Sequence, residues 1–190
     1  MSETTADPVG DATIPGWIAG TWTVDAFHSV VGFSVRHLMS KVRGRFTEFT
    51  VQIVTKDDPA QSSVTAAIEM ASVETGVTMR DDHLRSAEIF KAEENPNMRF
   101  ASTGLRRDGE NWVLSGDITI AETTRPVDIE LEFLGIDPTG IQGETRIGFS
   151  GKATIKRSDF GINFGLADDG KIVIGDKVEV SLDIEGYLDA

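Results

Sequence analysis

The sequence predicts an all-β protein, an extended eight-stranded antiparallel β-barrel with a short helical insertion between strands 3 and 4. Several long segments alternate apolar and polar residues, which places one face of a sheet in water and the other in an apolar interior. Short connections rich in Asp, Gly and Pro separate most of these segments, and such turns join antiparallel neighbours. A succession of antiparallel strands favours closure, because a closed barrel leaves no exposed sheet edge.

The strands are expected at residues 21–38, 42–55, 62–72, 98–107, 111–121, 125–136, 141–157 and 171–187. The alternation is clearest from Val127 to Phe133, where every odd position is apolar. After a turn at 137–140 it is expected to resume with an inward face that includes Ile141, Gly143, Thr145, Ile147, Phe149, Gly151, Ala153 and Ile155. A further turn is expected at 167–170. At ~3.3 Å per residue the longest strands span about 40 to 50 Å, which suits a tall barrel better than a compact sandwich.

The insertion between the third and fourth strands is about 25 residues long, too long for a plain turn. Thr78 and Asp81 fit a capping box, in which Thr78 accepts from the backbone of Asp81 and Asp81 reaches back. The pattern predicts a short helix over about 79–90, broken near Ser86, in a segment that Pro96 ends. Its apolar residues are suited to plug or cover one mouth of the barrel.

The chain has 190 residues, which predicts one domain over 19–190 preceded by a loose polar tail over 1–18. The formal net charge of −13 argues against nucleic acid and anionic membrane surfaces as partners, because both would repel the chain. The sequence holds no cysteine, which excludes disulfides, thiol nucleophiles and thiolate metal sites. The acidic start followed by no apolar run predicts a cytoplasmic protein without a signal peptide and without stable membrane insertion.

The residues expected on the inner face differ widely in size. Phe33, Phe49, Phe100 and Phe149 share this face with small residues such as Ala66 and Ala153. One interpretation is that the inward glycines only let the strands coil at the corners of a filled barrel. The other is that the small residues leave an elongated apolar cavity that holds a ligand.

The three histidines, His28, His37 and His83, are the main candidates for polar chemistry. No two of them have the short spacing of a metal motif, so we expect no metal site. They are then either structural residues or part of a polar mouth for a ligand head group. No nucleophile elbow is present, and the many carboxylates alternate outward, so no catalytic residue is assigned.

Many short motifs, spread in order over about residues 20–187, resemble those of the YceI-like family. They are Trp22-x-x-Asp25-x-x-His28-Ser29, Phe33-x-Val35-x-His37-Leu38, Gly44-x-Phe46-x-x-Phe49, Ser72-Val73-x-Thr75-Gly76, Arg80-Asp81-x-His83-Leu84-Arg85-Ser86, Pro96-x-Met98-x-Phe100-x-Ser102, Gly116-Asp117-Ile118-Thr119-Ile120, Thr124-Arg125-Pro126-Val127 and Arg157-Ser158-Asp159-Phe160-Gly161.

The resemblance implies a lipocalin-like barrel that binds, stores or transports a long-chain isoprenoid lipid, an isoprenoid quinone or a polyprenyl phosphate, without enzymatic activity. The lipid is then the ligand, no other cofactor is expected, and a homodimer is an oligomeric state that the family allows. The expected apolar lining is Phe33, Val35, Leu38, Phe46, Phe49, Met70, Leu84, Phe90, Phe100, Phe149 and Phe160. From the residues themselves we expect a polar rim for the head group at Arg36, His37, Arg80 and His83, because cations suit a phosphate or quinone oxygen.

Two other functions remain open at this point. The first is an enzyme that acts on an isoprenoid-like substrate through His28, His37 or His83, which requires a ring beside a carboxylate or a second ring at a cavity. The second is an interaction or stress protein with a solid core. Inward side chains that fill the whole interior would indicate this second function.

Overall fold

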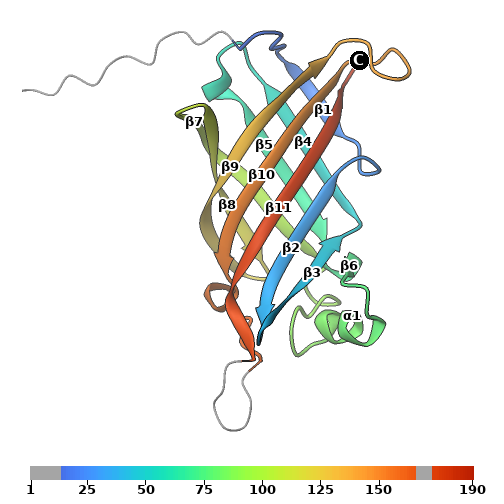
Figure 1. Cartoon of the computed structure of the whole chain (residues 1–190), viewed down its shortest axis with the longest axis vertical. Coiled ribbons are helices and arrows are strands. Elements are labelled where there is room, and N and C mark those ends of the chain that lie inside the picture. The colour runs from blue at the N-terminus through green and yellow to red at the C-terminus, as the bar shows by residue number, and fades with distance from the viewer. Residues whose placement is uncertain (1–13, 166–172) are drawn as a thin grey trace, which may run out of the picture.

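The computed structural model describes residues 14–165 and 173–190, and its strands form one continuous sheet that closes on itself (Figure 1). The strands are β1 (Gly20–Val24), β2 (Val30–His37), β3 (Ser40–Phe46), β4 (Phe49–Thr55), β5 (Ser63–Glu69), β6 (Val73–Glu74), β7 (Asn97–Asp108), β8 (Asn111–Ile120), β9 (Thr123–Asp137), β10 (Arg146–Lys156) and β11 (Ile174–Leu188). The helix α1 spans Thr78–Arg85, and 3-10 turns occupy Pro59–Gln61, Met70–Ser72 and Arg157–Phe160.

The barrel wall consists of eight antiparallel strand positions, which we call staves. Two of these staves are each interrupted once and therefore consist of two labelled strands. β1 and β2 follow one another along β11, separated at residues 25–29, and β3 and β4 are separated at residues 47–48. The ring therefore runs from β1 and β2 through β11, β10, β9, β8, β7 and β5 to β4 and β3, and pairing of β4 with β1 and of β3 with β2 closes it. The predicted eight-stranded antiparallel barrel is confirmed.

The strand predicted over 141–157 begins later than expected, at Arg146. The side chain of Asp137 accepts hydrogen bonds from the backbone N–H groups of Thr139 and Gly140, which turns the chain away from the sheet. Gly143 has a φ of 90°, and Ile141 is 86% exposed instead of facing inward. The inward placement predicted for residues 141–145 was wrong because local turn chemistry overrides the alternation.

Three other expectations fall partly or wholly on residues that the structure leaves undescribed. The turn predicted at 167–170 lies outside the described residues. So do residues 1–13 of the predicted tail and the first two residues of the strand predicted over 171–187.

The helix α1 lies at one end of the barrel, next to β6 (Figure 1), and we call this end the α1 end. α1 is shorter than predicted, and the capping box is wrong: the residue before the helix is Val77, without a capping side chain. The buried carboxylate of Asp81 instead accepts from the backbone N–H and the hydroxyl of Thr75, at 2.9 and 2.5 Å. Asp81 thus ties the helix to the segment after β6. Within the described residues, no helix has the length and apolar character to cross a membrane.

Two clusters of buried apolar residues lie inside the barrel. The larger one lies toward the α1 end and includes Met70, Val73 and Phe160. The smaller one consists of Trp22, Ile53 and Ile147 toward the opposite end. Trp22 is fully buried, and its indole N–H donates to the hydroxyl of Thr55 at 2.8 Å, so the polar atom of this large side chain is satisfied.

Candidate functional site

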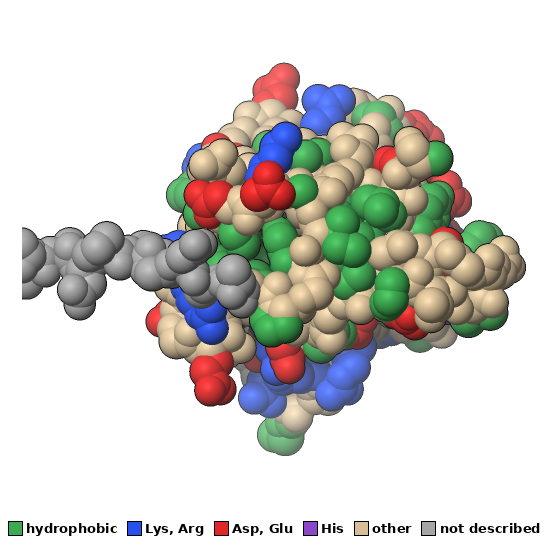
Figure 2. Space-filling view, turned by 90° about the horizontal axis from the view of Figure 1, so that it is seen from above, with side chains coloured by type: hydrophobic (Ala, Val, Ile, Leu, Met, Phe, Trp, Pro, Cys, Tyr) green, Lys and Arg blue, Asp and Glu red, His purple; other side chains and the backbone are tan. Residues whose placement is uncertain are grey.

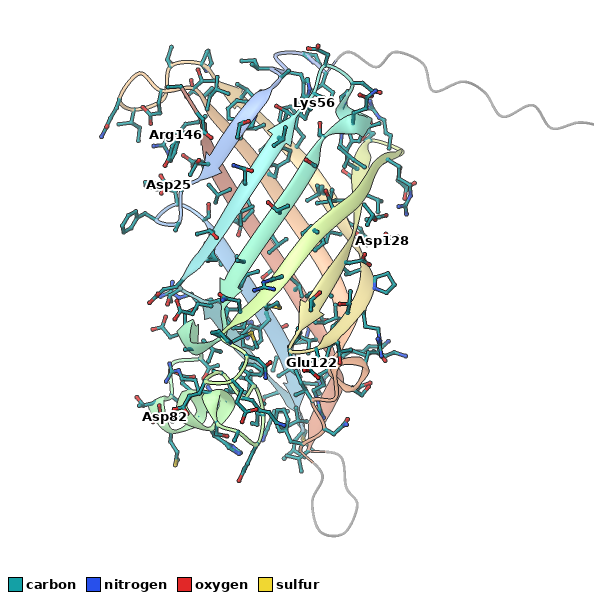
Figure 3. The ribbon with its side chains drawn as sticks, turned by 180° about the vertical axis from the view of Figure 1, so that it is seen from behind. Asp25, Lys56, Asp82, Glu122, Asp128 and Arg146 are labelled. Carbon is teal, nitrogen blue, oxygen red and sulfur yellow. The ribbon has the colours of Figure 1, made fainter. Side chains whose placement is uncertain are left out.

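The barrel encloses an elongated apolar cavity, with a volume of about 270 Å³ counted as space open to the centre of a water molecule. Trp17 and Ser62 line the end of the cavity near Lys56, whereas Arg157 and Phe164 line the α1 end. Figure 3 shows that Lys56 and the α1 residue Asp82 lie at opposite ends of the barrel. Apolar cavities of about 150 Å³ already stay dry and bind benzene, so this space suits an apolar ligand.

The structure places nine of the eleven expected lining residues on the cavity wall. They are Phe33, Val35, Phe46, Met70, Leu84, Phe90, Phe100, Phe149 and Phe160. Leu38 instead lies at the turn between β2 and β3, where it is 47% exposed, and Phe49 packs against the larger core cluster without lining the cavity. Contact of these residues with a lipid stays a prediction.

Small residues help to keep the cavity open. Ala66 and Ala153 lie on its wall, and the ring of Phe33 lies over Gly44. A Cβ atom on Gly44 would be 2.5 Å from the Cζ atom of Phe33, so any larger residue at this position would force the ring to shift. The interior is therefore partly open, which differs from the solid core expected of an interaction or stress protein.

Sequence reasoning missed two groups of lining residues. Aliphatic side chains complete the wall, among them Ile53, Val64, Leu105, Leu114, Ile118, Ile129, Leu131, Val180, Leu182 and Ile184. The period-two alternation of their strands is the signal that identifies them.

The second group that sequence reasoning missed is a single residue, Arg157. It carries the one charged side chain on the cavity wall within residues 14–165 and 173–190. Its guanidinium donates to the carbonyls of Gly175, Ile162 and Ile174 at 2.9, 2.7 and 3.0 Å. It also lies 4.8 Å from the ring centre of Phe164, and burial lowers the pKa of Arg157 from its usual value. One carbonyl five residues away and two carbonyls of β11 hold this cation, and no local sequence pattern signals such an arrangement.

The four residues expected to form the polar rim do not line the cavity. Arg36 is exposed on β2, and Arg80 donates to the hydroxyl and the carbonyl of Thr75 at 2.7 and 2.9 Å. His83 pairs with Glu88 at 2.9 Å on the exposed side of the insertion, and His37 is half-buried at the end of β2. Their role toward a head group stays a prediction.

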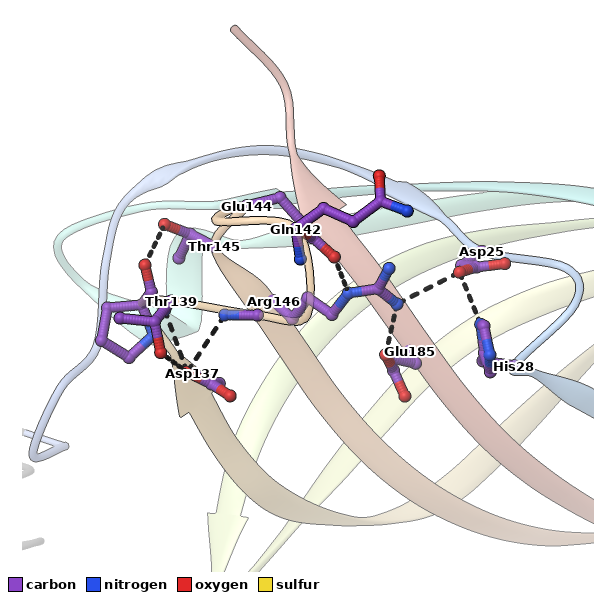
Figure 4. Close-up of polar contacts among 11 residues, drawn as sticks. Asp25, His28, Asp137, Thr139, Gln142, Glu144, Thr145, Arg146 and Glu185 are labelled. Atoms are coloured by element: carbon purple, nitrogen blue, oxygen red, sulfur yellow. Dashed lines mark hydrogen bonds and ion pairs between the residues drawn. The ribbon is translucent and has the colours of Figure 1, made fainter.

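A cluster of charged side chains spans the break between β1 and β2 (Figure 4). Arg146 donates to Glu144 at 2.5 Å and to Asp25 at 3.1 Å, and it also pairs with Glu185. Asp25 is bonded to the Nδ1 atom of His28 at 2.8 Å. Because Ile147 and Ile184 point inward, the neighbouring Arg146 and Glu185 lie on the outer wall, and the cluster fastens the interrupted stave to β10 and β11.

Replacement of Arg146 by Gln is expected to lower the urea midpoint of unfolding at pH 7, because it leaves three carboxylates without their cation. The hydrogen bond from His28, the backbone N–H of Phe27 and Arg146 lower the pKa of Asp25 below its usual value of 3.8. A depressed folded-state pKa contributes stability above the unfolded value, and this contribution is lost as the pH falls through the folded value. Urea unfolding should therefore show a smaller difference between the variant and the original protein at pH 3 than at pH 7, and an equal difference would contradict the assignment.

The histidines do not form a catalytic group at the cavity. His28 and His83 each meet a carboxylate, but both pairs lie on the outside, and no histidine is among the residues that line the cavity. In the part of the chain that the structure describes, His, Asp and Glu form no cluster suited to a metal ion. The enzyme alternative requires a histidine ring beside a carboxylate or a second ring at the cavity, and the three histidines do not form such a pair there.

Known proteins resemble this chain in sequence and in structure. A UPF0312 protein of Photorhabdus laumondii is 35% identical over 143 residues, 73% of each chain, and one of Staphylococcus epidermidis is 34% identical over 168 residues, covering 87% of this chain and 96% of its own. The YceI protein of Campylobacter jejuni has a TM-score of 0.69 at 26% identity, with full coverage of both chains.

Two further solved structures show the same fold at lower identity. BcnA of Burkholderia cenocepacia has a TM-score of 0.73 at 23% identity, covering 85% of this chain and 98% of its own. A polyisoprenoid binding domain of Saccharophagus degradans has a TM-score of 0.68 at 18% identity, covering 90% of this chain and all of its own. The family model of the YceI-like domain matches residues 22–186. The chain therefore belongs to the YceI-like family.

Proposed function

We propose that the protein binds a long-chain isoprenoid lipid, a quinone or a polyprenyl phosphate, inside the barrel, and that it stores or transports this lipid without chemical change. The observation that carries the proposal is the apolar cavity, whose wall extends from Trp17 at one end to Phe164 at the other. The relative from Saccharophagus degradans is named for polyisoprenoid binding, which supports the same ligand class.

The shape of the cavity favours a flexible, extended chain over a compact ligand. Burial of each methylene-sized group stabilises a complex by about 0.8 kcal/mol, so one isoprene unit of about five carbons contributes roughly 4 kcal/mol before the cost of ordering the chain. A few units therefore supply high affinity, while further units add little because ordering of the chain offsets them. Tail length is then selected by the length of the cavity.

The cation on the wall supports a position for the head group within this proposal. Arg157 lies at the α1 end of the cavity, and its guanidinium is half-buried among carbonyls and the ring of Phe164. A guanidinium is the side chain best suited to a phosphate or to a polarised oxygen in an apolar setting. The proposal therefore places the head group at the α1 end and the tail toward Trp17.

Mass spectrometry of an organic extract of the purified full chain tests the proposal. We expect a prenyl lipid at about one molecule per chain, because an apolar tunnel takes up an apolar chain in preference to water. Protein stripped of lipid should take up added ubiquinone, measured by quenching of tryptophan fluorescence since Trp17 lies on the wall, or undecaprenyl phosphate, measured by its displacement of ubiquinone. Protein that contains no prenyl lipid and takes up neither probe would refute the proposed function.

A further inference from the structure

Six exposed cations lie together on the outer wall of the barrel toward the α1 end. They are Arg36, Lys41, Arg43, Arg45, Lys156 and Lys177, which we call the basic face, and they come from β2, β3, β10 and β11. Figure 2 shows Lys and Arg side chains gathered along the lower edge of the view, the side that carries these strands in Figure 1. Lys41 pairs with Glu179 at 2.5 Å and Arg45 with Glu74 at 2.9 Å. In the described part of the chain, the other four make no ion pair.

The strand register places like charges directly opposite one another on this face. Arg36 is the cross-strand partner of Lys41, and Lys156 is the cross-strand partner of Lys177. Like charges in directly opposite positions destabilise a sheet. A chain with 31 acidic residues and a net charge of −13 nevertheless holds both repulsive pairs side by side on neighbouring staves. Glu179, which faces Arg36 and Lys41, and Asp176, which faces Lys156, offset part of this repulsion from within the protein, and an anionic partner would offset the rest.

The turn that joins β2 to β3 exposes two apolar side chains within the basic face. Leu38 is 47% exposed and Met39 is 96% exposed, and the opposed cations Arg36 and Lys41 flank them. Leu38 has a φ of 49°, a conformation that favours glycine or asparagine at such a turn. A strained, exposed leucine next to an exposed methionine indicates a role for the apolar side chains themselves.

A shallow groove of about 480 Å³ lies on the same wall between β2, β3 and β6. Arg43, Arg45, Glu74, Ser34, Ser181 and Thr75 are among the residues that line it, and Arg45 pairs with Glu74 at 2.9 Å. The guanidinium of Arg43, which makes no ion pair in the described part of the chain, lies here beside hydroxyls, a setting suited to the phosphate of a lipid head group. The groove therefore adds hydroxyl groups to the cations of the basic face.

We propose that the basic face and the Leu38–Met39 turn dock the protein on an anionic lipid bilayer, with the turn inserted among the head groups. Apolar side chains ringed by Lys and Arg are the combination that binds an anionic bilayer surface. Charges beyond about 8 Å are screened at physiological salt, so the local basic face and not the net charge governs this contact. The docked turn lies near the cavity, because Val35, on the same strand, lines its wall. Docking requires no occupied cavity, so it can fail or succeed independently of the proposed lipid ligand.

Flotation of the full chain with vesicles tests the proposal. We expect binding to phosphatidylcholine vesicles that contain about 30 mol % phosphatidylglycerol, no binding to pure phosphatidylcholine vesicles, and weaker binding as the salt concentration is raised. The combined change R36Q, R43Q and K177Q removes three cations, each worth about a fivefold factor at such a surface, so affinity should fall about 100-fold. Met39→Ser alone should weaken binding about tenfold through lost burial of the apolar side chain.

Matched controls separate local docking from net charge. The combined change K56Q, R106Q and R107Q removes the same number of cations at the end of the barrel away from α1, and Ile141→Ser removes an equally exposed apolar side chain there. Both should bind vesicles within about threefold of the original protein. Equal losses in the two charge variants would overturn the proposal. Absence of vesicle binding, with or without binding to a duplex nucleic acid, would overturn it as well.

Discussion

Replacement of Ala153 by Phe is expected to reduce lipid loading about 100-fold while the barrel remains folded. Ala153 lies on the cavity wall, opposite Val180 in the strand register. The new ring would enter space that is open, so it displaces about one isoprene unit of ligand instead of overpacking a filled core. The measurement is the amount of prenyl lipid extracted per chain, together with the affinity of stripped protein for added ubiquinone.

The matched control for this change is Ala101→Phe on β7. Ala101 is exposed on the outer wall, because its neighbour Phe100 lines the cavity. Ala101→Phe should leave loading within about twofold, since surface changes rarely alter a distant interior. Circular dichroism and urea unfolding show whether each variant is folded. A folded Ala153→Phe protein that loads as much lipid as the control would show that the ligand does not occupy this cavity.

Replacement of Trp22 by Ala is expected to have the largest effect on stability, a loss of about 3–5 kcal/mol. Trp22 is fully buried in the smaller core cluster with Ile53 and Ile147. Its removal leaves a void between β1 and β4, and it also takes away the indole N–H that donates to Thr55. Urea unfolding should show a lower midpoint with an unchanged slope, because the surface exposed on unfolding stays nearly the same.

Two further variants divide this effect into its parts. Trp22→Phe retains most of the apolar volume and removes the hydrogen bond, so it should cost about 1–2 kcal/mol. Phe27→Ala removes a ring that is 98% exposed and should change stability by less than about 0.5 kcal/mol. If Trp22→Ala lost less unfolding free energy than Trp22→Phe, the role of the smaller cluster in stability would be contradicted.

The alternation of apolar and polar residues was sufficient to predict the barrel, and together with the family resemblance it predicted nine residues of the cavity wall. A side chain on a strand faces inward or outward according to its position along the chain, so residues such as Phe33, Phe100 and Phe149 could be assigned before the fold was known. Leu38 broke this rule because it lies in a two-residue turn with a positive φ, where the period of two no longer applies. Residues 141–145 broke it because Asp137 forms local hydrogen bonds that compete with the sheet.

The polar features could not be predicted in the same way, since they depend on contacts between distant segments. Arg157 faces the cavity through carbonyls of residues 162, 174 and 175. Arg146 meets Asp25 across 121 positions of sequence. The basic face appears only when the register of four strands is known, although each cation is visible in the sequence. The net charge of the chain gave no sign of it.

The barrel closes through a joint between the first strand and the last. Trp22, Thr23 and Val24 pair with Leu188, Tyr187 and Gly186. During synthesis this pairing cannot form until almost the whole chain has left the ribosome. The growing sheet is therefore an open trough whose concave apolar face is exposed to water. Proteins dominated by contacts so remote in sequence fold slowly and expose sticky intermediates. Efficient production of the protein therefore depends on protecting the nascent trough, and slower translation or an added chaperone should raise the yield of closed barrels.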